Sequence, residues 1–141
     1  MRYVASVSKE GRRRLVEFPD CPGCQTVAEA GEDVAEIARE ALEGWLEAHL
    51  VRGGAPPRPK RVRVPAGGLA VTVSPMLAAK VSIRRARLDL GLTQAQLAKR
   101  AGLTQAMVAR IEDPDYNPTL ETLERVARAL GAELRISVEL P

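Results

Sequence analysis

The sequence predicts an α+β protein in which a small βββαβ domain precedes an all-α domain. Three observations lead to this prediction. Apolar and polar residues alternate as in strands through much of residues 2–30, apolar residues recur at helical spacing over 31–51, and the pattern is helical again from 74 to 131. We therefore expect one domain at residues 1–74 and a second at 75–141.

The length and charge of the chain set broad limits. With 141 residues, 45% of them hydrophobic, the chain can form one domain or two small ones with buried cores. Its N-terminus lacks the apolar run of a signal peptide or membrane helix, so we expect a cytoplasmic protein with no membrane partner. The net charge of +3 permits nucleic-acid binding, and positive charge is concentrated over residues 84–110, where Asp89 is the only acidic residue.

The first domain contains three candidate strands and one helix. The strands are YVASV, RRLVEF and CQTVA, with a turn at Glu10 and Gly11 between the first two. The helix over 31–51 has apolar residues on one side, and RGGAPPRP at 52–59 ends it because glycine and proline break helices. RVRV and GLAVTV then suggest one or two returning strands. The opposite side of the helix carries Glu36, Glu40, Glu43 and Glu47.

Capping signals divide the second domain into short helices. Ser74 and Pro75 are typical of a helix start, with serine as the N-cap and proline at the first helical position. Thr93 and Gln96 have the spacing of a capping box at the start of another helix. Gly102 follows where a tight turn into the next helix needs a residue that tolerates positive φ.

A short helix, a glycine-containing turn and a second short helix are typical of the helix-turn-helix motif. In that motif the second helix enters the major groove of DNA with its N-terminal residues, which here are Thr104, Gln105, Ala106 and Met107. The amide of Gln105 can pair with adenine, and the small Ala106 lets the helix approach thymine methyl groups. Gln94, at the start of the preceding helix, is a candidate phosphate contact.

The segments GLTQAQLAKRAGLTQAMVARIE and PTLETLERVARALG resemble the Cro-like, phage-repressor (XRE) family over roughly residues 83–131. The resemblance implies a bundle of four or five helices with phosphate contacts from the first motif helix and base contacts from the second. It also makes Arg110 and Asn117 candidates for contacts to the DNA backbone. Three arginines have two interpretations, a solvated helix face or phosphate contacts. They are Arg84, Arg85 and Arg87.

The C-terminal segment, residues 132–140, alternates between apolar and polar residues as a strand does. A single strand after a helical domain needs a partner, and self-pairing across a two-fold axis would give the dimer that palindromic operators require. Antiparallel pairing centred on Ser137 places Arg135 opposite Glu139 twice, and we predict this register. The alternative is that the segment extends the N-terminal sheet. The dimerisation residues would be Leu134, Ile136, Val138 and Leu140.

Cys21 and Cys24 are the only cysteines, and the residues between them favour a turn. Pro22 and Gly23 fit the second and third positions of a type II turn. A zinc site needs about four ligands, and His49 is the only histidine, so we expect no metal and no cofactor. A site shared across a dimer, with four thiolates, is the alternative.

The segment FPDCPGCQTVAEAGEDVAEIAREALEGWLEAHL, followed by PPRP, resembles the HicB family of antitoxins over about residues 3–59. The resemblance implies a partial ribonuclease-H-like βββαβ domain that binds a small basic, HicA-like, RNA-cleaving toxin. It further implies that the toxin–antitoxin complex represses its own promoter on operator DNA. Cys21 departs from the family pattern, which commonly has an apolar residue there. The alternative function is a stand-alone transcriptional regulator whose N-terminal domain senses a ligand or protein.

We expect no enzymatic activity. Two-metal phosphodiester cleavage needs several converging carboxylates, typically including one on a central strand, whereas the first candidate strand, YVASVS, has none. No nucleophile elbow, phosphate-binding glycine loop or zinc-hydrolase motif is present in the sequence. An enzyme, either a nuclease or a thiol oxidoreductase, is kept as the third interpretation of the function.

The glutamate side of the helix over 31–51 has two interpretations. It is either a solvated surface or a surface that contacts a basic partner protein.

Overall fold

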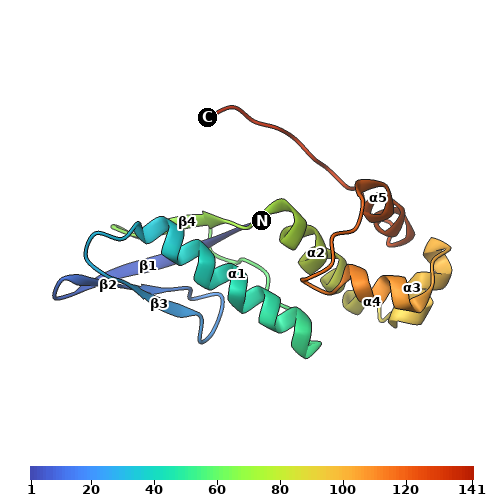
Figure 1. Ribbon diagram of the computed structural model, residues 1–141, viewed down its shortest axis with the longest axis horizontal. Helices are drawn as coiled ribbons and strands as arrows, with labels where there is room; N and C mark the ends of the chain where they lie inside the picture. Colours follow the sequence, from blue (N-terminus) through green and yellow to red (C-terminus); the bar gives the residue numbers. More distant parts are fainter. The chain divides into compact units, whose positions relative to one another are not determined.

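An antiparallel sheet of four strands forms the N-terminal part of the chain (Figure 1). The computed structural model describes residues 1–141 and divides into two units, Met1–Ala78 and Ala79–Pro141. The expected α+β class and the order βββαβ are confirmed. The strands are β1 (Arg2–Glu10), β2 (Arg13–Glu17), β3 (Gln25–Ala28) and β4 (Leu69–Thr72), in the spatial order β3-β2-β1-β4.

Helix α1 (Val34–Arg52) runs along the sheet and packs its apolar side against it (Figure 1). It begins at Val34 rather than at residue 31 because Asp33 is the N-cap, where its Oδ1 accepts the N–H of Ala35 at 3.0 Å. The expected helical spacing is confirmed by the burial of one residue in about every four. The buried residues of the helix are Ala38, Leu42, Leu46 and Leu50.

The predicted turn at the cysteines is present. The N–H of Cys24 donates to the carbonyl of Cys21 at 2.9 Å, and Gly23 has φ of +83°, as the third position of a type II turn requires. The N–H of Phe18 donates to the carbonyl of Cys24 at 3.1 Å and closes the loop between β2 and β3. Both cysteines are therefore buried by a turn built on Pro22 and Gly23.

Residues 53–68, here called the strap, join α1 to β4 without regular secondary structure. The predicted returning strand at 61–64 does not form, and only β4 returns to the sheet. The backbone N–H groups of Lys60 and Arg61 donate to Oδ2 of Asp20, at 2.8 and 2.9 Å, instead of to a neighbouring strand. A side chain in the loop between β2 and β3 thus replaces the expected strand pairing.

Two further hydrogen bonds fasten the strap to the first strand. The hydroxyl of Tyr3 donates to the carbonyl of Pro57 at 2.6 Å, and Nη2 of Arg2 donates to the carbonyl of Val62 at 3.3 Å. The Tyr3 side chain is fully buried. The strap is therefore held at several points, although its own backbone forms neither helix nor strand.

The second unit is helical. Helix α2 begins at Pro75, as expected from the serine and proline, and α3 to α5 follow within the second unit. Its core is formed by apolar side chains at helical spacing, among them Val81, Leu97, Val108, Ile111 and Val126. The helices are α2 (Pro75–Asp89), α3 (Gln94–Ala101), α4 (Gln105–Ile111) and α5 (Leu120–Ala129).

The C-terminal segment, residues 132–141, has no regular secondary structure in the single chain. The alternative that it extends the N-terminal sheet is wrong, because that sheet consists of β1 to β4 alone. The apolar side chains of Val138 and Leu140 are 94% and 91% exposed. The strand that pairs with its own copy stays a prediction, since an isolated chain offers it no partner.

Candidate nucleic-acid interface

Helix α3 has the local structure that its capping residues predict. Oγ1 of Thr93 accepts the N–H of Gln96 at 3.1 Å, and Oε1 of Gln96 accepts the N–H of Thr93 at 2.9 Å, which completes the capping box. Gly102 ends the helix with φ of +67°, in the left-handed region that favours glycine. The turn of the predicted motif is therefore built as expected.

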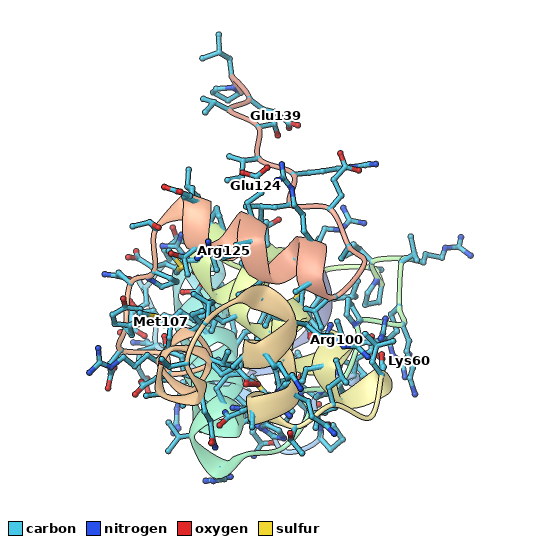
Figure 2. The ribbon with its side chains drawn as sticks, turned by 90° about the vertical axis from the view of Figure 1, so that its right-hand side faces the viewer. Lys60, Arg100, Met107, Glu124, Arg125 and Glu139 are labelled. Atoms are coloured by element: carbon cyan, nitrogen blue, oxygen red, sulfur yellow. The ribbon has the colours of Figure 1, made fainter.

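Helix α4 presents its N-terminal residues to solvent. Thr104 is the N-cap, and its Oγ1 accepts the N–H of Met107 at 3.2 Å. Gln105 and Ala106 are exposed, whereas Met107 is half-buried on α4 (Figure 2) and its Sδ lies 3.9 Å from the Tyr116 hydroxyl. The four predicted residues thus lie together in one turn, with the Gln105 side chain the longest that is fully exposed.

A buried carboxylate connects three helices behind this turn. Glu112, at the C-cap of α4, is 1% exposed and forms buried ion pairs with Arg84 and Arg87 of α2. Nε and Nη2 of Arg87 donate to it at 3.0 and 2.9 Å, and Nη1 of Arg87 donates to the Leu92 carbonyl at 2.9 Å. Nε2 of Gln94 on α3 donates to the same carboxylate at 3.1 Å. These side chains, here called the Glu112 cluster, fix the motif helices to α2.

The structure corrects one interpretation of the arginines. Arg84, Arg85 and Arg87 are 4%, 7% and 8% exposed, so they do not form a solvated helix face. The guanidinium groups of Arg84 and Arg87 neutralise Glu112, and phosphate contact by either would require that pair to break. Arg84 and Arg87 therefore have a structural role. Nε2 of Gln94, the only donor atom of its side chain, already donates to Glu112, so a phosphate contact by this side chain would use the second N–H of the same nitrogen.

Lys80 is a buried residue of the helix-turn-helix unit that sequence reasoning missed. It is 1% exposed, and its Nζ donates to the carbonyls of Asp113 and Tyr116, which belong to the loop after α4. Lys80, Arg84 and Arg87 are spaced i, i+4 and i+7 on α2, which is the spacing of a core-facing stripe. That spacing is the signal that could have identified these cations as buried rather than solvated.

Arg110 and Asn117 are both exposed, Arg110 in the last turn of α4 and Asn117 in the loop that follows. The guanidinium group of Arg110 forms no ion pair within the single chain, and the Asn117 side chain is uncharged. Both are therefore accessible to a DNA backbone, as the proposed contacts require.

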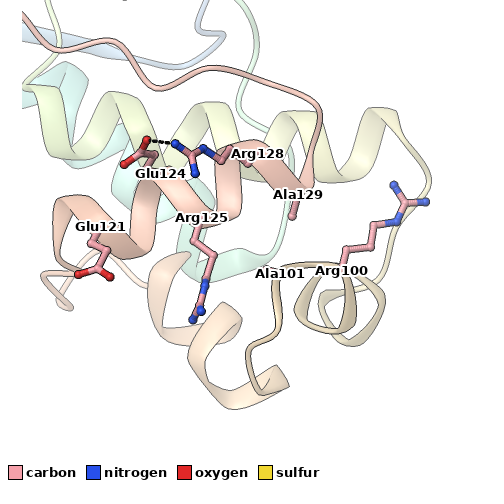
Figure 3. A pocket seen from close by; sticks show the side chains of 7 residues that line it. All are labelled: Arg100, Ala101, Glu121, Glu124, Arg125, Arg128 and Ala129. Carbon is pink, nitrogen blue, oxygen red and sulfur yellow. Dashed lines mark hydrogen bonds and ion pairs between the residues drawn. The ribbon is translucent and has the colours of Figure 1, made fainter.

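A shallow groove of about 380 Å³ lies between α3 and α5 (Figure 3). Arg128 and Glu124 form an ion pair with Nη2 and Oε1 2.6 Å apart, and Arg100 and Arg125 point in other directions. The lining carries charges of both signs and includes no cysteine, histidine or serine that could act as a nucleophile with a base. The residues that line the groove are Arg100, Ala101, Glu121, Glu124, Arg125, Arg128 and Ala129.

The Cys24 thiol is in an environment that suppresses reactivity. Burial raises the pKa of Cys24 to about 11, and its Sγ lies 3.8 Å from the Ala41 carbonyl. The reactive form of a cysteine is the thiolate, which such a pKa disfavours at neutral pH. No group of three or more His, Cys, Asp or Glu side chains is arranged to hold a metal ion. None of the helices has the length and apolarity to cross a membrane.

The acidic side of α1 is smaller than the sequence suggested. Glu36, Glu40 and Glu47 are exposed, whereas Glu43 is half-buried and its Oε1 accepts the N–H of Ser74 at 2.7 Å. Glu43 therefore fixes the segment between β4 and α2. The other three glutamates form the acidic face of α1, a name that is kept below for these residues alone.

Comparisons with known proteins agree with both halves of this description. A helix-turn-helix family model, HTH_3, matches residues 83–136. Antitoxin HicB 1 of Photorhabdus laumondii is 34% identical over 140 residues, which cover 99% of this chain and 88% of that protein. The immunity repressor protein of Bacillus phage phi105 is 48% identical over 52 residues, 37% of this chain and 36% of that protein.

A chain of the solved HicA3 and HicB3 toxin-antitoxin complex aligns with 52% of this chain and 99% of its own length, at 24% identity and a TM-score of 0.41. The relationship to the Photorhabdus protein is the stronger finding, because it extends through the sheet, the strap and the helices alike. The chain therefore belongs to the HicB antitoxin family, and its C-terminal part is a helix-turn-helix domain.

Proposed function

We propose that this protein is the antitoxin of a toxin–antitoxin pair. Residues 1–74 bind and neutralise a small basic RNA-cleaving toxin, and residues 75–141 repress the shared operon by binding operator DNA. Family membership over nearly the whole chain supports the first half of the proposal. The observation that supports the second half is the exposed N-terminal turn of α4, a helix whose C-terminal end is joined to α2 and α3 by the Glu112 cluster.

Gln105 is the proposed base reader. Its side chain is long, exposed and located where a recognition helix first meets base edges, and an amide can make two hydrogen bonds to adenine. Thr104, Ala106 and Met107 would shape the contact around it. Gln94 would add a phosphate contact that positions the helix without reading sequence.

The C-terminal segment would make the repressor a dimer. Pairing of two copies, centred on Ser137, would cover the apolar row at Ile136, Val138 and Leu140, which the single chain leaves largely exposed. In this register each Arg135 lies opposite a Glu139 of the other copy. Two motifs related by a two-fold axis match the two half-sites of a palindromic operator.

The acidic face of α1 would meet the toxin. Three exposed carboxylates on one helix attract a basic protein and speed its association. Glu43 does not belong to this surface, because it binds the Ser74 backbone.

Recovery of the protein from its native cell extract tests the proposal. The extract is kept in moderate salt and treated with nuclease, and mass spectrometry identifies what remains bound. A stoichiometric small basic protein is the expected result. If the protein is recovered without any bound protein, yet still binds the DNA upstream of its own gene, the function is instead that of a stand-alone transcriptional regulator.

A further inference from the structure

The strap is a second basic surface, separate in sequence from the helix-turn-helix. No acidic residue occurs between Ala48 and Leu88. Five exposed cations lie within 52–63, near or within the strap. They are Arg52, Arg58, Lys60, Arg61 and Arg63.

The strap holds these cations on a fixed backbone. Its N–H groups at 60 and 61 donate to Asp20, and its carbonyls at 57 and 62 accept from Tyr3 and Arg2. Prolines at 56, 57, 59 and 65 restrict φ and lower the entropy that the segment loses when it binds a partner. At residues 57, 60, 61 and 62 the strap is anchored through backbone atoms rather than through the charged ends of its side chains.

Two of the cations are free of internal ion pairs. Arg61 is held by Asp20, with Nε and Oδ1 3.5 Å apart, although its side chain is still 58% exposed. The side chains of Lys60 and Arg63 form no ion pair within the chain. A partner can therefore contact these two charges without breaking an ion pair.

A groove of about 590 Å³ lies between the strap and the first strand, and its lining identifies the kind of partner. Arg61 and Arg63 line it beside Ser6, the other lining residues are valine, proline and alanine, and no acidic or aromatic residue takes part. Single-stranded nucleic acids are usually bound by aromatic side chains that stack on bases, and none is present here. Phosphates of a duplex need only cations and hydrogen-bond donors.

We propose that the strap binds the phosphate backbone of double-stranded DNA without regard to sequence. Two observations support this proposal. The segment that contains the exposed cations has no acidic residue and is held by hydrogen bonds to its backbone, and two of its arginines line the neighbouring groove. The strap would add affinity for any duplex, whereas α4 would supply the preference for the operator. Its function is therefore distinct from base reading and does not depend on which residues of α4 read bases.

The test is the salt dependence of binding to a random-sequence duplex and to the upstream duplex. Each phosphate contact on B-DNA contributes about 0.9 to the slope of log affinity against log salt concentration. Lys60→Gln combined with Arg63→Gln should lower the slope by roughly 2 per bound chain on both duplexes. When the salt is raised from about 50 to 200 mM, the affinity of both proteins falls, and the factor by which it falls should be roughly 12 times smaller for the variant than for the natural protein.

The matched control is Lys9→Gln with Arg12→Gln, which removes the same charge from exposed positions of the β1–β2 hairpin. It should change the slope by much less than the strap variant. Equal slopes for the strap variant and the natural protein would overturn the proposal. The same salt titration is repeated with single-stranded RNA, and a strap variant that loses affinity only for that RNA would also overturn it. Gln105→Ala separates the two proposals, because it should reduce operator preference and leave the salt slope on random duplex unchanged.

Discussion

Glu112 brings together side chains from α2, α3 and α4, and its carboxylate pairs with the buried guanidinium groups of both Arg84 and Arg87. A buried charge that loses its partner is costly, whereas an exposed ion pair contributes little. The same type of residue therefore has very different importance at different positions of the helical unit.

Replacement of Glu112 should show this difference. Glu112→Gln removes the carboxylate that both Arg84 and Arg87 contact in the buried cluster, and we expect the free energy of unfolding to fall by about 3–5 kcal/mol. The control is Glu124→Gln on α5, whose exposed ion pair with Arg128 should contribute no more than about 1 kcal/mol. Urea unfolding of both variants measures the two effects, and equal losses would contradict the assigned role of Glu112.

Asp20 links the cysteine turn to the strap and gives the first unit a pH dependence. Burial of its carboxyl raises the pKa, but hydrogen bonds from the Arg61 and Lys60 backbones and the charges of the same residues outweigh this. The net pKa is lowered from 3.8. The native state then binds fewer protons than the unfolded chain just below pH 3.8, so stability rises with pH across that window.

Asp20→Asn should remove this contribution. The variant should be less stable by about 1 kcal/mol above pH 4, since a charge-assisted pair of hydrogen bonds is weakened. The difference should shrink as the pH falls through the lowered pKa of Asp20, where the natural carboxyl becomes neutral too. Thermal unfolding from pH 2.5 to 7 follows both proteins, and a constant difference over that range would show that the charge of Asp20 has no such effect.

At the scale of the element, local signals placed most helices and strands correctly. The capping box at Thr93, the glycine at 102 and the apolar spacing of α1 depend on residues within one or two turns, and each formed as expected. Residues 61–64 have good local propensity for a strand, but they form none. The backbone N–H groups of Lys60 and Arg61 donate instead to Asp20, which lies 40 and 41 residues earlier in the chain. No window of neighbouring residues contains that information.

The recognition helix provides the prediction at this scale. Gln105→Ala should reduce the discrimination between operator and random DNA by roughly 1–3 kcal/mol while the fold is kept. Gln25→Ala, a change of the same chemistry at an exposed position of β3, is the control and should leave discrimination unchanged. Fluorescence anisotropy with both duplexes measures the ratio, and an equal loss on all sequences would mean that Gln105 does not read bases.

At the scale of the whole molecule, the C-terminal segment is the part whose structure depends on a second chain. Its apolar residues have nothing to pack against in the monomer, and its backbone has no strand beside it. Its alternating pattern therefore predicts a strand that an isolated chain cannot complete.

A cysteine at the centre of the pairing tests the register. In the Ser137-centred dimer the two copies of residue 137 face each other at a distance that a disulfide can span, so Ser137→Cys should crosslink into a covalent dimer on oxidation. Glu139→Cys is the control, because its two copies would lie roughly 13 Å apart along the strands. Non-reducing electrophoresis of the folded proteins distinguishes them, and efficient crosslinking of the control alone would contradict the register.

The sequence by itself determined the α+β order, the helix caps, the cysteine turn and the helix-turn-helix motif, because these depend on periodicity and on contacts between near neighbours. Only the tertiary structure decided that Lys80, Arg84 and Arg87 are buried and that the strap is fastened to the sheet. Burial of a charge is unfavourable unless the group is paired, and the hydrogen-bond partners of these three cations lie 25 to 36 residues away in the sequence. Whether a cation is solvated or neutralised is therefore set by the packing of distant segments.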